Sequence, residues 1–456
     1  MRKMKRPLIL EAIKKYAYRD VARFHMPGHK GLEEYAEIFH GAETDITELS
    51  FSGNLSAGKG LIRDAEEQIA KTLGAYSSHI VTDGSTAAIF AMVYAASLRG
   101  SKLIIPRISH KSVYNALKIF RMEPVFLPTY EKNGMIVQDV NSIGKLLNRE
   151  KKAAGVLLVS PDYYGNVPFL EIAAEETRKK GKLLLVDSAH GGHLKFSAPH
   201  LYAGEFADAW VDGVHKTLPS LTQAAVLSVN DEDLEEDITE GLSLFRTTSP
   251  SYPIMASAEF GVLFAEWVNI DGFRRVFDLA DKLLEGAAGR KYVFVKTADR
   301  CKLLLDCPAS GLDAEALVKY LEKRGVYAEF SDGRYVVFML SVLNVKEDFD
   351  KLRKTLIAYR RTKFKKADND GKRPFSDFTP VRAVTYTEAV NAPYDLVEAI
   401  NAGGRIAADN FGFFPPCYPV ITAGEVFTEE LAEALVKADN SFGVRDKRLK
   451  VVRERL

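Results

Sequence analysis

Two residues with reactive side chains each follow an apolar run of this sequence. Lys216 lies in "DGVHKTLPSLTQ" (212–223), after "AWVDG" (209–213), and Asp187 ends "KLLLVD" (182–187). Most lysines lie on solvated surfaces, so a lysine where a strand meets a turn is either a misread surface residue or a reactive amine. The apolar residues before Asp187 predict a buried carboxylate, which either pairs with a cationic or hydrogen-bonding partner or caps the following glycine turn.

Two further segments place polar residues at predicted helix starts. In "TDGSTAAIF" (82–90) a helix opens on Gly84, Ser85 and Thr86, and in "SHKS" another opens after His110. Free N–H groups, the helix dipole and two hydroxyl groups suit a phosphate, although an ordinary helix cap has the same composition. The segment lacks the GxxxxGK[ST] pattern, which excludes a P-loop. A lone histidine at a helix start is more often a cap than a catalytic group.

Together these residues meet the requirements of pyridoxal phosphate. The lysine stands 29 positions after the aspartate (216 − 187). Its amine can form a Schiff base with the cofactor aldehyde, and the aspartate can keep the ring nitrogen protonated so that the ring accepts electrons. The helix start can hold the phosphate and the histidine can stack on the ring. The combination therefore indicates a pyridoxal-phosphate enzyme more strongly than any one of its parts.

Seven short apolar runs must position these residues. Several are apolar throughout, as strands covered on both faces are, and segments with helical spacing, such as 86–98 and 169–181, separate them. The pattern predicts an α/β fold with a mostly parallel seven-stranded sheet, whose strand carboxyl ends hold the ligand. The runs are "HIVT" (79–82), "KLIIP" (102–106), "PVFLP" (124–128), "GVLLVS" (155–160), "KLLLVD" (182–187), "AWVDG" (209–213) and "AAVLSV" (224–229).

The chain is predicted to have four parts. An N-terminal arm (1–45) precedes the cofactor-binding large domain (46–290), a smaller α+β domain (291–360) and a C-terminal domain (374–456). The charged stretch 360–373 between the last two is predicted to be an exposed linker. A length of 456 residues is ample for such a division.

The composition is that of a soluble globular protein. The hydrophobic fraction is 46%, and the net charge of +1 gives no general attraction to nucleic acid or to membranes. No apolar run approaches the length that spans a bilayer. Cys301, Cys307 and Cys417 form no CxxC pair, so we expect free thiols in a reducing compartment and no metal site. These features predict a cytoplasmic location.

Across most of its length the sequence resembles the fold-type I, pyridoxal-phosphate-dependent Orn/Lys/Arg decarboxylases, in the short form without the extra N-terminal domain. Seven motifs occur in the family's order, and two of them are long and fairly specific. "GRIAAD" (404–409) and "PPCYPVITAGE" (415–425) resemble the family's C-terminal region. The seven are "FHMPGHKG" (24–31), "DITEL" (45–49), "DGSTAA" (83–88), "SHKS" (109–112), "DSAHGGH" (187–193), "HKTLPSLTQ" (215–223) and "TTSPSY" (247–252).

The resemblance implies a role for each candidate residue. Lys216 would carry the cofactor, Asp187 would pair with its ring nitrogen, and His215 would lie near its phosphate. The implied catalytic residues are Lys216, His215, Asp187 and His110. The implied cofactor-binding residues are Gly84, Ser85, Thr86, His110 stacked on the ring, Asp187, Ala189 beneath the ring, His215 and Lys216.

The implied reaction is decarboxylation of a basic L-amino acid, lysine, ornithine or arginine, to a polyamine-type amine and carbon dioxide. Asp45, Glu48 and Glu425 are candidates to receive the distal cation of the substrate, although a structural ion pair or cap is as good an interpretation for each. The resemblance also implies a homodimer, or a pair of dimers, with the active site at the interface and "TTSPSY" serving the neighbouring subunit. Another reaction of the same cofactor (transamination, racemisation or aldolase-type cleavage) and an inactive regulatory relative are the alternatives.

The sequence departs from the family at several positions. Gly213 replaces a common serine three residues before the lysine, Cys417 replaces a glycine, Ala423 replaces a proline, and "NLS" (54–56) stands for "DLH". None of these removes a catalytic group, but they leave the substrate open. The loop "FHMPGHKG" (24–31) is predicted to be either a rigid turn or a cover over the mouth of the active site.

Overall fold

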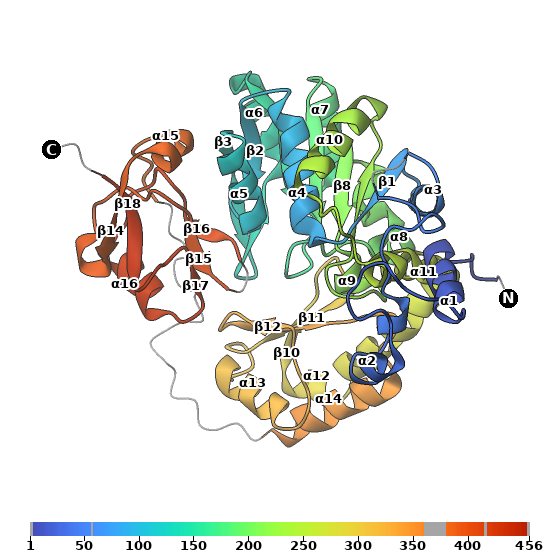
Figure 1. Cartoon of the computed structure of the whole chain (residues 1–456). Helices are drawn as coiled ribbons and strands as arrows, with labels where there is room; N and C mark the ends of the chain where they lie inside the picture. The colour runs from blue at the N-terminus through green and yellow to red at the C-terminus, as the bar shows by residue number, and fades with distance from the viewer. Residues whose placement is uncertain (1–2, 56–57, 360–379, 415–416, 454–456) are drawn as a thin grey trace.

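The architecture is that of a large α/β domain with two smaller sheets beside it. The computed structural model describes residues 3–55, 58–359, 380–414 and 417–453 (Figure 1). The predicted linker 360–373 lies outside the described residues. Among the described residues, no helix is long and apolar enough to cross a membrane.

The seven predicted apolar runs form the seven strands of the central sheet. All strands are parallel except β9, which runs antiparallel to both of its neighbours. The strand order is β1 (Ser77–Val81), β9 (Ala225–Val229), β8 (Ala209–Asp212), β7 (Leu183–Ser188), β6 (Ala153–Val159), β2 (Lys102–Pro106) and β3 (Glu123–Leu127). The predicted fold class is confirmed.

Two hydrophobic cores cover the two faces of this sheet. Successive strand residues point to opposite faces, so Leu185 packs into one core while Leu184 and Val186 pack into the other. The first core holds α4 (Gly84–Ser97), α5 (Lys111–Ile119) and α10 (Glu235–Phe245). The second holds α1 (Leu8–Ala17), α3 (Leu61–Leu73), α6 (Ile143–Arg149), α7 (Leu170–Arg178), α8 (Leu194–Ser197) and α11 (Tyr252–Glu285). Burial of the strands on both faces explains why their sequences are apolar throughout.

A four-stranded antiparallel sheet lies below the large domain (Figure 1). Its strand order is β10 (Val293–Val295), β11 (Lys302–Asp306), β13 (Tyr335–Met339) and β12 (Phe330–Ser331), with α12 (Ala287–Lys291), α13 (Ala314–Glu322) and α14 (Lys346–Ala358) beside it. A hairpin of β4 (Thr129–Lys132) and β5 (Met135–Gln138) leaves the large domain.

The C-terminal part is drawn in orange and red in Figure 1 and forms its own small core. It pairs β14 (Tyr394–Glu398) with β18 (Arg448–Val452), and β15 (Phe411–Phe413) with β16 (Pro419–Ile421) and β17 (Ser441–Phe442). Its helices are α15 (Tyr386–Asn391) and α16 (Glu429–Lys437).

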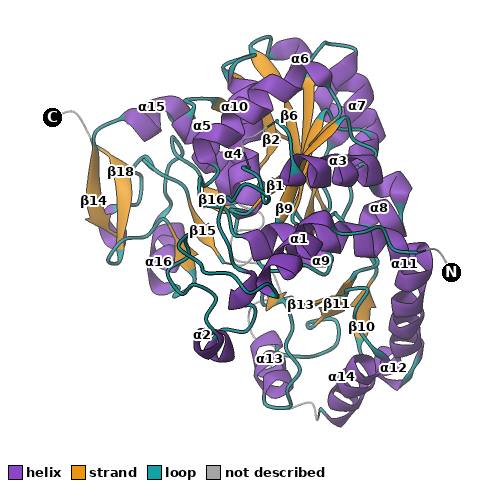
Figure 2. Cartoon of the chain, turned by 45° about the vertical axis from the view of Figure 1, so that its right-hand side comes forward, coloured by secondary structure: helices purple, strands orange, loops and turns teal. Residues whose placement is uncertain are grey.

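The boundaries predicted between domains stay predictions. One continuous core runs from Ile9 on α1, through the central sheet, to Tyr359 after α14, so the arm, the large domain and the small domain share buried contacts. Figure 2 shows α1 and the short helix α9 (Val214–Thr217) between the two larger sheets, and the short helix α2 (Glu33–Ile38) lower in the view.

Candidate active site

A cavity of about 220 Å³ lies at the carboxyl ends of the parallel strands. The topology brings these ends together although they are far apart in the sequence. The cavity is lined by all eight predicted cofactor-binding residues, Gly84, Ser85, Thr86, His110, Asp187, Ala189, His215 and Lys216.

The first turn of α4 forms one wall of the cavity. Gly84 has a φ of +72°, which glycine adopts without strain, and its N–H donates to the carbonyl of Gln223 at 2.9 Å. The next N–H groups of the helix have no partner within the helix. The hydroxyl oxygen of Ser85 is buried without a hydrogen-bond partner among the described residues. This wall therefore offers donors of the kind that an anion needs.

Asp187 ends β7 and is buried, as its apolar run predicts. One carboxylate oxygen accepts the N–H of Ala189 at 3.2 Å. Burial raises the pKa of Asp187, while the nearby Lys216 ammonium and the Ala189 N–H act in the opposite direction. The site thus holds a desolvated carboxylate whose charge depends on a neighbouring cation.

Lys216 lies in the one-turn helix α9, just after β8. Its Nζ is 3.3 Å from Nε2 of His190 and 5.9 Å from the ring centre of Tyr163. Burial lowers the pKa of Lys216, and the charge of Asp187 opposes that shift. A lysine with a lowered pKa is a better nucleophile near neutral pH than an exposed lysine.

The two predicted histidines lie on other sides of the cavity. His110 caps α5, and its Nδ1 accepts the N–H of Ser112 at 3.2 Å. Burial, with the charges of Lys216 and Lys111, lowers the pKa of His110 to about 4. The Nδ1–H of His215 donates to the carbonyl of Ala224 at 2.8 Å, and burial lowers its pKa. Both imidazoles are therefore uncharged at neutral pH.

Several residues of the site were not predicted from the sequence. His190 and Tyr163 line the cavity with their rings 4.7 Å apart. The quoted motif "DSAHGGH" contains His190, but nothing in its spacing marked that residue, and Tyr163 lies outside the quoted motifs. Lys302 of β11 reaches His190, and the exposed carboxylate of Glu329 interacts electrostatically with Lys216 and Lys302.

Comparison with known proteins decides the family. The sequence profile "Orn/Lys/Arg decarboxylase, major domain" matches residues 7–272. The chain belongs to this family. Arginine decarboxylase of Bacillus subtilis is 27% identical over 92% of this chain and 90% of its own length. Constitutive lysine decarboxylase of Escherichia coli is 29% identical over 56% of this chain and 39% of its own length.

Solved structures support the same fold. The structure of the Escherichia coli constitutive lysine decarboxylase has a TM-score of 0.79 at 20% identity and covers 98% of this chain and 82% of its own. Serine palmitoyltransferase of Sphingomonas wittichii has a TM-score of 0.56 at 16% identity, covering 77% of this chain and 83% of its own. The predictions of the family, of the fold type and of an amino-acid decarboxylase are confirmed.

The geometry explains one departure of this family member. A Cβ added at Gly213 would lie 2.5 Å from the carbonyl oxygen of Ala189 and 3.1 Å from the Ser85 hydroxyl. The backbone therefore passes too close to its neighbours for the serine common in the family. Cys417 has a φ of +65°, and its carbonyl accepts the N–H of Lys111 at 3.0 Å, so the C-terminal part touches the start of α5. Residues 56, 415 and 416 of the quoted motifs lie outside the described residues.

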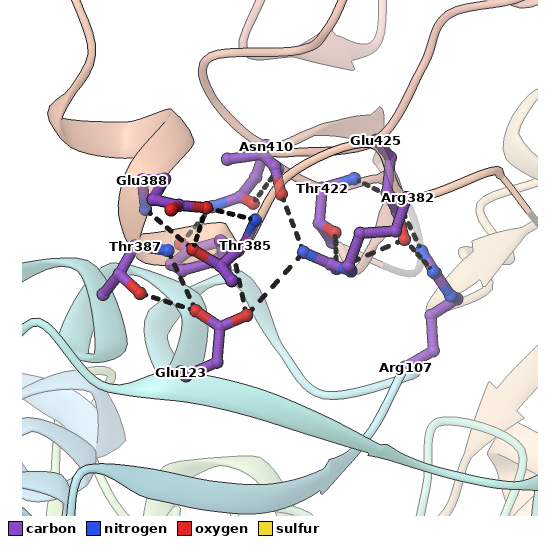
Figure 3. Close-up of polar contacts among 11 residues, drawn as sticks. Arg107, Glu123, Arg382, Thr385, Thr387, Glu388, Asn410, Thr422 and Glu425 are labelled. Carbon is purple, nitrogen blue, oxygen red and sulfur yellow. Dashed lines mark hydrogen bonds and ion pairs between the residues drawn. The ribbon is translucent and has the colours of Figure 1, made fainter.

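Glu425, a candidate for binding the substrate cation, is already engaged (Figure 3). It is buried and accepts hydrogen bonds from Arg107 at 3.2 Å, from Arg382 at 3.4 Å and from the Thr422 N–H at 2.7 Å. Nearby, Glu123 of β3 accepts the N–H groups of Tyr386 and Thr387. These contacts join the C-terminal part to the large domain, so Glu425 forms a structural ion pair.

The other two candidate acids lie away from the cavity. Asp45 contacts His29 at 3.4 Å in a separate groove beside α1 and α11, and Glu48 accepts the N–H of Leu55 at 3.3 Å. His29 stacks on Tyr35 in the same groove, and the lining of the Lys216 cavity includes no residue of the loop "FHMPGHKG".

A buried ion pair lies behind His190. Nε2 of His193 is 2.7 Å from a carboxylate oxygen of Asp299, and both side chains are fully buried. Burial alone would lower the pKa of His193, but Asp299 and Cys301 raise it to about 10. The three cysteines are free and buried. The attraction between a protonated His193 and an ionised Asp299 explains why these two polar side chains are buried together.

Proposed function

We propose that this chain decarboxylates a basic L-amino acid, lysine, ornithine or arginine, with pyridoxal phosphate as cofactor. The observation that carries the proposal is the convergence of Lys216, Asp187 and the first turn of α4 in one cavity. Arginine decarboxylases matched over nearly the whole chain, and lysine decarboxylases matched over 56% of it, support the substrate class.

The cavity fits this cofactor. The Ser85 hydroxyl, which has no partner within the described part of the chain, suits its phosphate, as do the N–H groups of α4 and the hydroxyl of Thr86. Asp187 suits its ring nitrogen. When bound, pyridoxal phosphate supplies an aldehyde that joins covalently to an amine and a ring that withdraws electrons from bonds at Cα.

The residues around it then have distinct tasks. Asp187 keeps a proton on the ring nitrogen, because a buried carboxylate gains much from a cationic partner. Lys216 supplies the amine that holds the cofactor, and its Nζ, or His215, returns a proton to Cα after carbon dioxide has left. His110 stays uncharged and presents a flat ring. The buried lining residues Val159, Ala189 and His190 exclude water from one side of the cavity.

Glu329 is our proposed partner for the distal cation of the substrate. It follows α13 in the small domain, its side chain is exposed, and its charge acts on Lys216, Lys302 and Tyr163. An exposed carboxylate near the cavity is still free to exchange water for a substrate ammonium or guanidinium. The structural role of Glu425 leaves Glu329 as the better candidate.

We also propose a homodimer. Large apolar side chains are exposed along the N-terminal segment, among them Phe24 at 97% and Tyr18 at 85%. The groove beside them is lined by Leu221 and by Ser251 of "TTSPSY". Apolar surface of this kind is typical of an interface. Its closeness to the segment after Lys216 supports an active site that the partner completes, in a cytoplasmic enzyme.

The first test is release of carbon dioxide from L-lysine, L-ornithine and L-arginine with added pyridoxal phosphate. We expect release from at least one substrate and none from Lys216→Ala. The amine product must appear in equal amount, which separates decarboxylation from transamination and racemisation. If the wild-type protein takes up the cofactor but releases no carbon dioxide, the proposed reaction is wrong.

Glu329→Gln tests the proposed substrate contact. We expect KM for the preferred substrate to rise about tenfold with little change in kcat, because one charge-assisted hydrogen bond is lost. Glu322→Gln, an exposed acid on the same domain, is the matched control. An unchanged KM in Glu329→Gln would assign the distal cation to another group.

A further inference from the structure

Two lysines, the buried Lys302 and the partly buried Lys216, contact the same imidazole. Nζ of Lys302 lies 3.0 Å from Nδ1 of His190, and Nζ of Lys216 lies 3.3 Å from Nε2. Lys302 is 3% exposed and comes from β11 of the small domain. An uncharged imidazole has one N–H and one lone pair, so it cannot accept hydrogen bonds from both lysines. One of the two lysines must accept the imidazole N–H as an uncharged amine.

The imidazole itself is uncharged. Burial, with the charges of Lys216 and Lys302, lowers the pKa of His190 well below its usual value. A protonated His190 would present an N–H to each lysine and leave neither ammonium with an acceptor. The shared hydrogen bonds therefore have only two arrangements, which differ in the lysine that carries the charge.

The surroundings favour the charge on Lys302. Among the described residues, a ring nitrogen of His190 is the hydrogen-bond partner of each lysine Nζ, so the nearby charges decide between the two lysines. The buried carboxylates of Asp299 and Asp162 act on Lys302. Lys216 interacts electrostatically with Asp187, Glu329, Cys417, Lys302, His110, His190 and His215. Besides the two aspartates, Lys302 interacts electrostatically with Cys301, Glu329, Lys216 and His190.

Asp187 does not reverse this preference. Its carboxylate accepts the N–H of Ala189 at 3.2 Å, and among the described residues the hydrogen-bond partner of Lys216 Nζ is His190. Burial lowers the pKa of both lysines, but only Lys216 lines the cavity where an amine is needed.

We propose that Lys302 is a positioning residue that holds Lys216 in its uncharged form through His190. Lys302 donates to Nδ1, which fixes the proton of His190 on Nε2, and the Nε2–H donates to Nζ of Lys216. This inference rests on the proposed function, because the uncharged amine is the form that attacks the aldehyde of the cofactor. Nζ then bonds to the aldehyde carbon, and the aldehyde oxygen leaves as water with the two amine protons.

The packing around Lys302 restricts movement of the hydrogen-bonded chain from Lys302 through His190 to Lys216, which we call the relay. The turn at Gly165 lies over it, and a Cβ added there would be 2.9 Å from Cγ of Lys302 and 3.1 Å from Cβ of Asp299. The N–H of Asp299 donates to the carbonyl of Gly165 at 3.0 Å. The ring of Tyr163 packs on His190 from the same turn. The small domain therefore holds a charge at a fixed distance from the reactive lysine.

The test measures the reactivity of Lys216 against pH in protein freed of cofactor with hydroxylamine. Brief treatment with acetic anhydride, followed by mass spectrometry of the peptide that contains Lys216, gives the pH of half-maximal modification. Lys302→Met removes the charge and the donor at similar volume, and Lys302→Arg keeps both. Lys319→Met, an exposed lysine of the same domain, is the matched control.

We expect Lys302→Met to move this midpoint upward by about one pH unit, so that modification near neutral pH falls about tenfold. The midpoints of Lys302→Arg and Lys319→Met should stay close to that of the wild type. An unchanged midpoint in a folded Lys302→Met protein would overturn the relay. If that variant does not fold, His190→Phe replaces it; the midpoint should again rise, because Lys216 loses the N–H that stabilises its uncharged form, and an unchanged midpoint overturns the proposal.

A second measurement separates this inference from the proposed function. Wild-type protein freed of cofactor is mixed with pyridoxal phosphate and reduced with borohydride, and the labelled peptide is identified. Labelling at Lys216 together with an unchanged midpoint in Lys302→Met would refute the relay alone. Absence of any label at Lys216 in the wild type would refute the proposed function.

Discussion

Two clusters of charged residues in this protein differ in how completely their groups are paired. Around Glu425, both carboxylate oxygens accept hydrogen bonds from arginines, and one also accepts a backbone N–H (Figure 3). Around Lys216, the Ser85 hydroxyl has no described partner and two lysines share one imidazole. A fully paired cluster has few free donors and acceptors with which to bind a ligand. An incompletely paired buried cluster is stabilised by a ligand that supplies the missing hydrogen bonds or charge.

This difference separates a structural acid from a catalytic acid. Asp187 and Glu425 are both buried carboxylates, but Asp187 has one described hydrogen bond, from a backbone N–H. Counting the partners of each oxygen therefore distinguishes them where burial alone does not. Substitutions in the two clusters should affect different properties of the protein.

The largest effect is expected for Asp187→Asn. The asparagine can still accept the Ala189 N–H but cannot hold a proton on the ring nitrogen, so we expect carbon dioxide release to fall about 10²–10⁴-fold. The melting temperature should change little, because a neutral amide is easier to bury than a carboxylate. Release rate and thermal unfolding are measured on the same sample. Activity within a few-fold of wild type would place the essential carboxylate elsewhere.

A smaller effect, on stability, is expected for Glu425→Gln. Arg107 and Arg382 lose a charged acceptor, and the free energy of unfolding should fall by about 1.5–3 kcal/mol. The kcat/KM of the folded enzyme should stay near the wild-type value. Urea unfolding measures the loss, with the exposed Glu430→Gln of α16 as the matched control. A large loss of activity without a loss of stability would contradict the structural role of Glu425.

The sequence predicted the framework of the catalytic cluster. Long apolar runs such as "GVLLVS" can satisfy both of their faces only inside a helix-covered sheet, and all seven runs form strands of that sheet. Since strand ends meet at one edge, the residues that follow them also meet, which explains why the eight predicted residues share one cavity.

The remaining features depend on contacts between distant segments. Lys302 belongs to β11 of another sheet and Glu329 precedes β12 of that sheet. The placement of this sheet follows from packing of α11 and the shared core, and no local pattern encodes it. Gly213 has a similar explanation. In the sequence, Gly213 is only the replacement of a common serine, whereas the close approach of the Ala189 carbonyl shows that a side chain does not fit there.

The smallest expected effect is a loss of folding stability in acid that depends on His110, one of the residues that line the Lys216 cavity. Unfolded, this histidine binds a proton near pH 6.5, but burial lowers its pKa in the folded protein to about 4. Between these values the unfolded chain binds more protons, so the contribution of His110 to stability is present above pH 6.5 and is lost as the pH falls through about 4. At pH 5 the loss should be about 1–2 kcal/mol.

His110→Phe isolates this contribution in protein freed of cofactor, because it keeps an aromatic ring and removes the titrating group. The helix cap is lost as well, which lowers stability equally at every pH, so the informative quantity is the difference between the free energies of unfolding at about pH 8 and about pH 5. That difference should be smaller in the variant than in the wild type by the stated 1–2 kcal/mol. Equal differences in the two proteins would mean that His110 is hydrated enough to titrate normally. The contrast between the desolvated residues around Lys216 and the paired residues around Glu425 would then no longer hold at His110.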